Sequence, residues 1–332
     1  MSPLTIQRLF LYPVKSLRPV EVKAVELTNE GLRFDRSFIL VYTPDAATPA
    51  DPNGDLPFAK FLTIKRVFKL ALFHPEIDES WMNLTIRYKG DDAPKASIDV
   101  PLSPSPISLL GAKSYQVSVF GTTAIGVDVG DEVASFFSTR LNADVRLLFI
   151  GGTGRREIPG AAYVGKQGDA LTLALEEGLR PQRIRFADAA PLLVTSTASE
   201  RDALLRLPPE YREEDVIQRL RPNIHIDVHN SLPAYDEDNW STLSVATASN
   251  GSHVVTIKCI FNCVRCLSLN ADPDTGQMVE RRRQLYGLLA SDRRINTRFP
   301  HKPVFGQYAF AGPAGAILRI GDTVKVTERS SK

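Results

Sequence analysis

Short runs in which hydrophobic and polar residues alternate dominate the first 150 positions of the chain. The runs are rich in β-branched and aromatic residues, and turns containing Gly, Pro or Asp separate most of them, as is typical of β-strands. They cover residues 4–12, 20–27, 36–42, 61–64, 70–74, 83–88 and 115–120. This pattern predicts a β-barrel or roll in the first part of the chain.

One helical pattern follows at residues 130–143 (GDEVASFFSTRLNA) and leads into a predicted strand at 145–150. Residues 151–170 are rich in Gly and mixed charge, which indicates a loop near a domain boundary. We therefore expect a first domain at 1–150, a linker at 151–170 and a second domain at 171–332.

The second half mixes the two kinds of pattern. A strand at 190–199 runs into a helix at 199–207, for which Ser199 is the expected N-cap, with Asp202 three residues on. Further strands are predicted at 223–228, 253–259, 304–310 and 316–327, and a further helix at 280–290. The fold class is therefore α+β, with a barrel-like first domain and a mixed, β-rich second domain.

Composition narrows the function classes. The chain has 332 residues, 43% of them hydrophobic, which is enough for two cores without disulfides. Its 40 basic and 38 acidic residues are well mixed, so no polycationic face indicates nucleic-acid binding. The N-terminal segment lacks a long apolar run and is interrupted at Pro13, unlike a signal peptide or membrane span. We expect a soluble, intracellular protein.

Two other sequence patterns, a P-loop-like stretch and a pair of histidines, give only weak support for a functional site. Residues 160–167 (GAAYVGKQ) fit a phosphate-binding P-loop except at the last position, where Gln167 replaces the hydroxyl residue, so a flexible linker is the preferred interpretation. His225 and His229 cannot share a helix face if residues 223–228 form a strand. We expect all five histidines to be satisfied internally or exposed.

All three cysteines lie between positions 259 and 266, in the stretch KCIFNCVRCLSLNADPDTG. Cys259, Cys263 and Cys266 fit the C-x-x-x-C-x-x-C spacing of radical SAM enzymes. Fewer than 70 residues follow Cys266, however, and the β/α barrel of such enzymes needs about 200. A closed zinc site needs four ligands, but the chain has no second C-x-x-C pair, and its one H-x-x-x-H pair, His225 and His229, lies on a predicted strand.

Two interpretations of the cysteines remain. Buried thiols that act as small hydrophobes suit Cys259, which closes an alternating strand pattern. Cys266 suits a reactive or ligating thiolate better, because Arg265 beside it would favour the charged form. Cys266 could then bind one soft metal whose other ligands come from a cofactor.

Seven fragments, in this order, resemble the MOSC-domain molybdenum enzymes, and in particular the amidoxime reducing component group. They are LYPVKS (11–16), LRFDRSF (32–38), FADAAPLLVTSTAS (186–199), LRPNI (220–224), DEDNW (236–240), CVRCLSLNADPDTG (263–276) and PVFGQY (303–308). The resemblance covers residues 5 to 326, and it implies a barrel-like N-terminal MOSC domain packed on the MOSC domain.

The resemblance assigns roles to individual residues. It makes Cys266 the molybdenum ligand, leaves Cys259 and Cys263 without a role, and places Asp188 near the metal. The cofactor it implies is a molybdopterin, whose terminal phosphate needs cationic and hydrogen-bonding partners. The matching positions are Lys15, Ser16, Arg36, Thr195, Ser196, Thr197, Arg221, Asn223 and Arg265. Asp272 and Asp274 would shape the turn that presents Cys266.

The resemblance also implies a reaction and a partner. Family members remove oxygen from N-hydroxylated compounds such as amidoximes and hydroxylamines, and some reduce nitrite or nitrate. Electrons would come from an external donor, a b-type cytochrome with its flavin reductase in the animal family. The membrane-targeting segment of the animal proteins has no counterpart here, so a cytoplasmic and a mitochondria-associated location both stay open, and pyridoxal phosphate binding is a secondary expectation.

Two other functions remain open. The protein could carry sulfur as a persulfide on Cys266 without any metal, since related domains end cofactor sulfurases. It could also bind or store the cofactor without catalysis. Molybdenum content separates the first alternative from a reductase, and turnover of benzamidoxime with a reduced dye separates the second.

Overall fold

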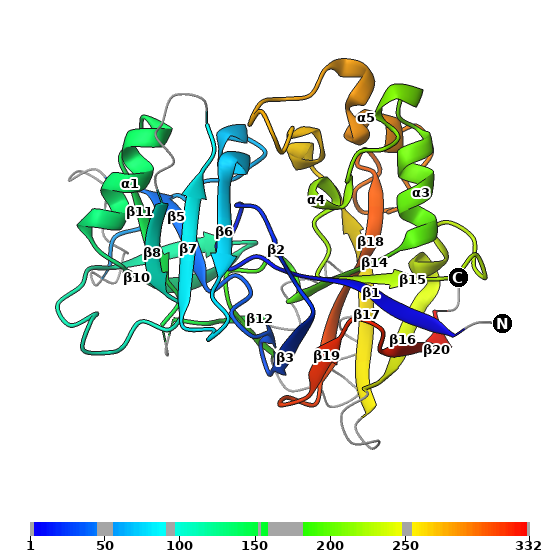
Figure 1. Ribbon diagram of the computed structural model, residues 1–332, viewed down its shortest axis with the longest axis horizontal. Coiled ribbons are helices and arrows are strands. Elements are labelled where there is room, and N and C mark those ends of the chain that lie inside the picture. Colours follow the sequence, from blue (N-terminus) through cyan, green and yellow to red (C-terminus); the bar gives the residue numbers. More distant parts are fainter. Residues whose placement is uncertain are drawn as a thin grey trace.

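The computed structural model describes residues 3–44, 56–90, 97–151, 154–158, 182–247 and 254–330. These residues form a β-rich α+β fold of two lobes that lie side by side (Figure 1). The lobe with α1 comes from the first half of the chain, and the lobe with α3 mainly from the second. The predicted fold class is confirmed.

A mixed β-barrel forms the second lobe. Its strand order is β15-β14-β18-β17-β16-β20-β1, and β1 pairs with β15 to close the ring, while β2 (Val20–Val22) extends the sheet from β1. The barrel strands are β1 (Leu4–Leu11), β14 (Leu192–Ser196), β15 (Ile224–Asp227), β16 (Trp240–Ala246), β17 (Val254–Val264), β18 (Val304–Gly312) and β20 (Thr323–Arg329). The first strand of the chain thus completes a barrel built otherwise from its second half.

Alternation along the strands fills the barrel. Leu192 and Val194 of β14, Ile224 and Ile226 of β15, and Cys259 of β17 belong to one buried cluster. Residues that alternate with them, such as Thr195 and His225, face the other side of the sheet, where α3 (Thr197–Leu205) packs. The prediction that Cys259 faces a core is confirmed.

The first lobe contains two sheets and a helix. One sheet has the order β5-β11-β10-β9, and the other the order β6-β7-β8. The strands are β5 (Phe38–Tyr42), β6 (Phe73–Ile77), β7 (Asn83–Tyr88), β8 (Ser97–Pro101), β9 (Ser114–Val119), β10 (Thr122–Asp128) and β11 (Val145–Phe149). Helix α1 (Asp131–Leu141), predicted from its apolar spacing, buries Val133, Phe136 and Phe137 in this core.

Shorter elements connect the lobes and surround the site. The small strands are β3 (Ala24–Thr28), β4 (Gly31–Leu32), β12 (Arg156–Ile158), β13 (Gln182–Ile184) and β19 (Ile317–Arg319). The remaining helices are α4 (Ile217–Leu220), α5 (Leu285–Leu289) and the 3₁₀ turns η1 (Phe68–Leu72), η2 (Pro209–Tyr211), η3 (Asp236–Asn239), η4 (Leu267–Asn270) and η5 (Arg281–Arg283). In the described ranges, no helix has the length and apolar character needed to cross a membrane.

Several predicted elements were wrong. Residues 61–64 form only an isolated bridge at Phe61, and 70–74 begin as the 3₁₀ turn η1. The helix expected at 280–290 is split into η5 and α5, and β12 lies inside the expected linker. Such short segments hold too few residues for the hydrophobic period to decide between helix and strand. The P-loop-like motif at 160–167 lies outside the described residues, and the division at residue 150 stays a prediction.

The N-cap of α3 is Ser196, not Ser199. The Ser196 hydroxyl accepts a hydrogen bond from the Ser199 amide, so the helix begins at Thr197. Asp202 binds Arg206 one turn later and the Tyr235 hydroxyl. The misplacement arose because the run of hydroxyl residues at 195–199 offers several capping candidates, and tertiary packing selects among them.

Candidate functional site

Cys266 lies two residues after the end of the long strand β17 and occupies the N-cap position of the 3₁₀ turn η4. Its backbone is extended, and its Sγ lies 3.1 Å from the Ser268 hydroxyl. Cys259 and Cys263 are both buried, and burial raises the pKa of Cys259 to about 12 and also raises that of Cys263. Cys266 is the partly exposed thiol of the three, as a ligand for an incoming group must be.

The turn after Cys266 is built by its own side chains and by the first lobe. Asp272 accepts hydrogen bonds from the amides of Asp274, at 2.9 Å, and Thr275, at 3.1 Å. Gly276 has φ +62°, and a Cβ there would lie 2.7 Å from the Leu72 side chain. The two hydrogen bonds to Asp272 shape the turn, as expected from the sequence. The close approach of Gly276 to Leu72 packs the turn tightly against η1.

A second group of residues surrounds the buried ring of Tyr12. The guanidinium carbon of Arg36 lies 4.2 Å from the ring centre, and that of Arg221 lies 4.5 Å from it. Arg36 is fixed by Asp35 at 2.5 Å and by the Asn223 side-chain oxygen at 3.0 Å. Arg221 has no hydrogen bond or ion pair from its guanidinium to any residue in the described ranges.

Arg36 and Arg221 also share an unusual backbone. Their φ angles are +47° and +60°, and Ser16, another predicted cofactor contact, has φ +74°. Left-handed conformations cost free energy for residues with a Cβ, and they persist where the surrounding structure imposes them, often at functional sites. Three of the predicted anion contacts therefore adopt a backbone that the local sequence alone does not favour.

Lys15 and Asp188 form an ion pair at the edge of this group. The Lys15 ammonium also donates to the Phe186 carbonyl at 2.8 Å, and burial lowers the pKa of Lys15. Burial alone would raise the pKa of Asp188, but the Lys15 charge holds it below its usual value. The Asp188 side chain is 42% exposed, so it offers an ionised carboxylate to whatever enters the site.

Arg265 links the cysteine segment to the turn that carries Arg221. It donates to the Leu220 carbonyl at 2.6 Å and to Cys263 Sγ at 3.3 Å, while its Nε has no partner in the described part of the chain. Burial lowers the pKa of Arg221 to about 10, and Arg36, Asp188 and Arg265 lie close enough to influence it. The structure thus brings five of the predicted residues together: Lys15, Arg36, Asp188, Arg221 and Arg265.

The charges in this group do not balance. Lys15, Arg36, Arg221 and Arg265 supply four positive charges, while Asp35 and Asp188 supply two negative ones. Because burial disfavours unpaired charge, such an excess is expected where an anion completes the arrangement. An oxyanion such as a phosphate fits this set of donors.

The remaining predicted contacts are occupied by protein partners. Thr195 Oγ1 lies 2.8 Å from His225 Nδ1, and Thr197 donates to Asp227 at 3.2 Å. Ser16 donates to the Leu62 carbonyl at 3.2 Å. Asn223 binds Arg36, the Leu193 amide and the Phe10 carbonyl. Direct contact between these four side chains and a cofactor stays a prediction.

The histidines behave as expected where they are described. His225 is fully buried between Thr195 and Glu200, whose carboxylate lies 3.0 Å from Nε2. His229 pairs with Asp227 at 3.0 Å.

No group of three or more His, Cys, Asp or Glu side chains in the described ranges is arranged to hold a metal ion by itself. A metal at this site would therefore need ligands that a cofactor brings.

Arg156 is a residue that the sequence did not indicate. Its buried guanidinium donates to the carbonyls of Arg185, Ala187 and Asp188, and also to Val119 and Thr122. It therefore fixes the backbone that carries Asp188. No sequence signal could reveal it, because it lies in the segment expected as a linker and its acceptors come from distant parts of the chain.

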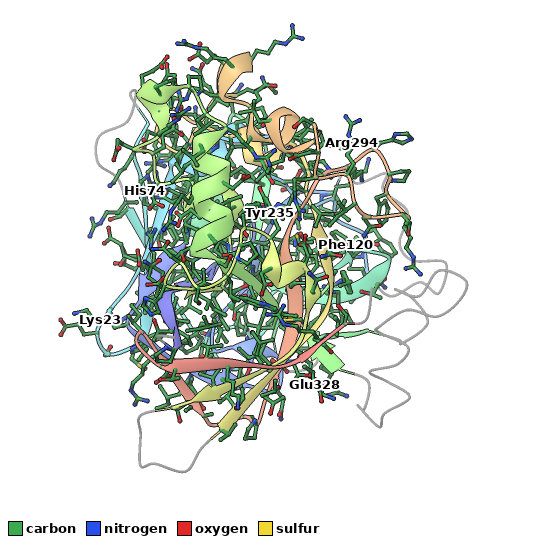
Figure 2. All side chains as sticks on the ribbon, turned by 90° about the vertical axis from the view of Figure 1, so that its right-hand side faces the viewer. Lys23, His74, Phe120, Tyr235, Arg294 and Glu328 are labelled. Atoms are coloured by element: carbon green, nitrogen blue, oxygen red, sulfur yellow. The ribbon has the colours of Figure 1, made fainter. Side chains whose placement is uncertain are left out.

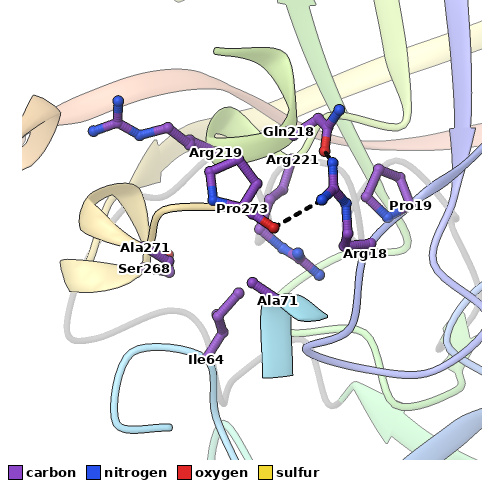
Figure 3. Close-up of a pocket in the computed structure, with 10 residues that line it drawn as sticks. All are labelled: Arg18, Pro19, Ile64, Ala71, Gln218, Arg219, Arg221, Ser268, Ala271 and Pro273. Carbon is purple, nitrogen blue, oxygen red and sulfur yellow. Dashed lines mark hydrogen bonds between the residues drawn. The ribbon is translucent and has the colours of Figure 1, made fainter. Parts of the chain in front are cut away.

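A small cavity of about 10 Å³ lies between the lobes next to the cysteine turn (Figure 3). Arg18 donates across it to the Pro273 carbonyl at 2.7 Å and to Gln218. Arg221 and Ser268 also line it, together with Pro19, Ile64, Ala71, Arg219 and Ala271. Its volume suits about one water molecule. The cavity joins the region of Arg221 to the hydroxyl that contacts Cys266.

Ser196, another predicted cofactor contact, is bonded to a buried carboxyl group. The Ser196 hydroxyl donates to Glu237 Oε2 at 2.9 Å, while Glu237 Oε1 has no partner in the described structure. Burial raises the pKa of Glu237 from 4.5 to about 7. Between these values the folded state keeps a proton that the unfolded state has lost, so this group makes stability fall as pH rises.

We expect Glu237→Gln to remove this contribution to the pH dependence of the free energy of unfolding. The full effect of the native carboxyl is about 3 kcal/mol between pH 4 and pH 8. Urea unfolding of both proteins across this range measures it, and Glu79→Gln, at an exposed position, is the control. Parallel stability curves for native protein and Glu237→Gln would show that the carboxyl titrates normally.

Comparison with known proteins shows the family to which the chain belongs. Residues 3–144 match the MOSC N-terminal beta barrel domain and residues 181–325 the MOSC domain. The mitochondrial amidoxime reducing component 2 of Macaca fascicularis is 27% identical, over 96% of this chain and 82% of that protein, and the Homo sapiens protein gives the same values. A molybdenum cofactor sulfurase of Danio rerio is 27% identical over 82% of this chain, but only 29% of that protein is covered. The chain therefore belongs to the MOSC-domain proteins and is a distant relative, along nearly its whole length, of the mitochondrial amidoxime reducing components.

Proposed function

We propose that this protein is a molybdenum cofactor-dependent reductase that removes oxygen from N-hydroxylated compounds such as amidoximes and hydroxylamines, and, as a secondary activity, from nitrite or nitrate. The observation that carries the proposal is the partly exposed Cys266 thiol beside a buried excess of cations that includes the unpaired Arg221. The relatives named as amidoxime reducing components support the reaction, and the relative named as a molybdenum cofactor sulfurase supports only a link to the cofactor.

The residues present fit such a cofactor. Cys266 offers a soft thiolate ligand, and Arg36, Arg221 and Lys15 offer cationic partners for a phosphate. When bound, the molybdenum cofactor supplies the two-electron chemistry of the reduction. The overall change takes up two electrons and two protons and yields the reduced nitrogen compound and water.

The chain itself supplies binding and a proton path in this proposal. Lys15 and Asp188 share an ion pair at a half-exposed edge of the site, so they can hold and pass a proton between solvent and the substrate oxygen. Arg156 keeps the backbone at Asp188 in place. Tyr12 is fully buried, and Arg36 and Arg221 lie against its ring, so the low polarity of these surroundings strengthens their electrostatic contacts.

Two measurements test the proposal. Protein purified from a host that makes molybdopterin should contain close to one molybdenum per chain, and it should reduce benzamidoxime with a reduced viologen dye. Absence of molybdenum combined with a persulfide on Cys266 would favour the sulfur-carrier alternative. Molybdenum without turnover would favour a binding or storage protein.

An external donor completes the proposal. The described residues hold no further cysteine cluster for a second redox centre, since all three cysteines of the chain lie between 259 and 266. A b-type cytochrome with its flavin reductase is the donor we propose. The cellular location, cytoplasmic or mitochondria-associated, follows from where that donor resides.

A further inference from the structure

One surface loop differs in charge from the rest of the molecule. Residues 294–302 (RINTRFPHK), called the basic loop here, contain Arg294, Arg298, His301 and Lys302 and no acidic residue, in a chain whose charges are otherwise well mixed. These four side chains are exposed. Arg294 and Lys302 have no ion pair with any described residue. The loop therefore presents uncompensated positive charge to solvent.

The basic loop also exposes apolar surface. Ile295 is 45% exposed and Phe299 is 48% exposed, and the Lys302 ammonium lies 5.2 Å from the Phe299 ring. Apolar side chains ringed by charge are typical of protein–protein contacts, which have an apolar centre and a polar rim. The arrangement fits a partner that presents carboxylates around a small apolar patch.

The basic loop is held in one shape. At its base, Arg293 pairs with Asp238 and lies 3.6 Å from the Tyr235 ring centre, and the Val304 amide donates to the Arg293 carbonyl at 2.9 Å. Within the loop, the Asn296 side chain accepts from the amides of Arg298 and Phe299. Such internal bonding lowers the ordering cost of binding.

The basic loop ends beside the candidate metal ligand. The Arg265 amide donates to the Pro303 carbonyl at 2.8 Å, and Val304 pairs with Val264 in the barrel. Lys302 is thus one residue from the strand segment that leads to Cys266. Leu267, which follows Cys266, is 44% exposed. A protein docked on the loop would lie next to the site.

We propose that the basic loop is the docking surface for the acidic face of the protein that delivers electrons to the site. The inference rests on the proposed function, which needs such a donor close to Cys266. Redox partners often form small, transient interfaces, and charge complementarity accelerates their encounter. An anionic membrane is the less favoured occupant, because two apolar side chains on a turn give little buried area compared with an amphipathic helix.

Charge reversal tests the surface. The variant Arg294→Glu/Lys302→Glu is compared with Lys23→Glu/Lys325→Glu, which changes net charge equally at exposed positions elsewhere. Arg294 and Lys23 lie on opposite sides of the molecule in Figure 2. The probe is the soluble domain of an acidic b-type cytochrome. Its binding to the purified proteins is titrated, and benzamidoxime turnover is driven either by the reduced cytochrome or by a reduced viologen.

The loop variant should bind the cytochrome about tenfold more weakly at low salt and lose cytochrome-driven kcat/KM to a similar extent. Raising the ionic strength should remove the difference, and viologen-driven turnover should not change. Equal loss in the Lys23/Lys325 variant, or no binding by native protein, would overturn the surface. So would capture of native protein by phosphatidylserine vesicles that the loop variant loses while cytochrome binding is unchanged. Absence of viologen-driven turnover in native protein would count against the proposed function, and the titration would still decide on the surface.

Discussion

Cys266→Ser is expected to reduce benzamidoxime turnover to the background of the dye reaction and to leave the fold intact. A serine hydroxyl is a hard ligand with a high pKa, and it cannot replace an electron-rich thiolate at a redox metal. Folding should survive because Cys266 is partly exposed and its Sγ contacts only the Ser268 hydroxyl among the described hydrogen bonds. Molybdenum content, turnover and thermal melting of the same preparation measure the three properties.

The other two cysteines provide the matched controls. Cys259→Ser places a hydroxyl in the apolar barrel interior, so it should lower the free energy of unfolding by about 1–3 kcal/mol while turnover per folded molecule persists. Cys263→Ser keeps an acceptor for Arg265 and should also remain active. Equal loss of activity in all three variants, with iron and labile sulfide in the native protein, would indicate a cluster instead of a single ligand.

Arg221→Met is expected to lower molybdenum occupancy while the free energy of unfolding stays constant or rises. Among the described residues its guanidinium lies over the Tyr12 ring and has no hydrogen bond or ion pair, so the fold loses little when the charge is removed. A bound phosphate would lose a charge-assisted hydrogen bond worth about 1.5–3 kcal/mol, or about ten- to a hundredfold in affinity. Metal analysis after dialysis against a dilute cofactor pool, with urea unfolding alongside, measures both effects.

Arg36 and Lys15 should respond differently from Arg221. Arg36→Met removes the ion-pair partner of the buried Asp35 carboxylate, which keeps only a hydrogen bond from the Tyr12 amide among the described contacts, so both occupancy and stability should fall. Lys15→Met removes the partner of Asp188, which is half exposed and can be solvated, so the stability loss should be smaller. Arg281→Met, at an exposed position, controls for the loss of one charge. Full occupancy in the Arg221, Arg36 and Lys15 variants would contradict the assignment of a phosphate to this group.

The second lobe cannot be tested as a separate fragment, because its barrel includes a strand from the start of the chain. A chain that begins near residue 170 lacks β1, which pairs with both β15 and β20. Without it the barrel would have two unpaired edges, and its core would be open to solvent. Point substitutions are therefore the sound way to separate the contribution of the first half of the chain to the site.

The sequence determined those strands and helices in which the hydrophobic pattern repeats over enough residues to distinguish the two. Alternation over residues 83–88, 115–120 and 304–310 became β7, β9 and β18, and apolar spacing over 130–143 became α1. The resemblance of seven short fragments then gave the family, which the two domain matches confirm. These features are local, so each depends on neighbouring residues that the sequence displays directly.

The tertiary structure decided everything that depends on distant partners. The sequence favoured Cys266 as the ligand and a buried position for Cys259, and packing shows that Cys263 is buried too, while Cys266 is partly exposed. The unpaired state of Arg221 could not be predicted, since it depends on what the other lobe supplies. Arg156 holds Asp188 through acceptors from two separate segments, residues 119–122 and 185–188, and β1 closes a barrel with strands more than 200 residues away. Burial and hydrogen-bond partnership are properties of the folded arrangement, because free energies of desolvation and pairing depend on which groups meet and not on their order along the chain.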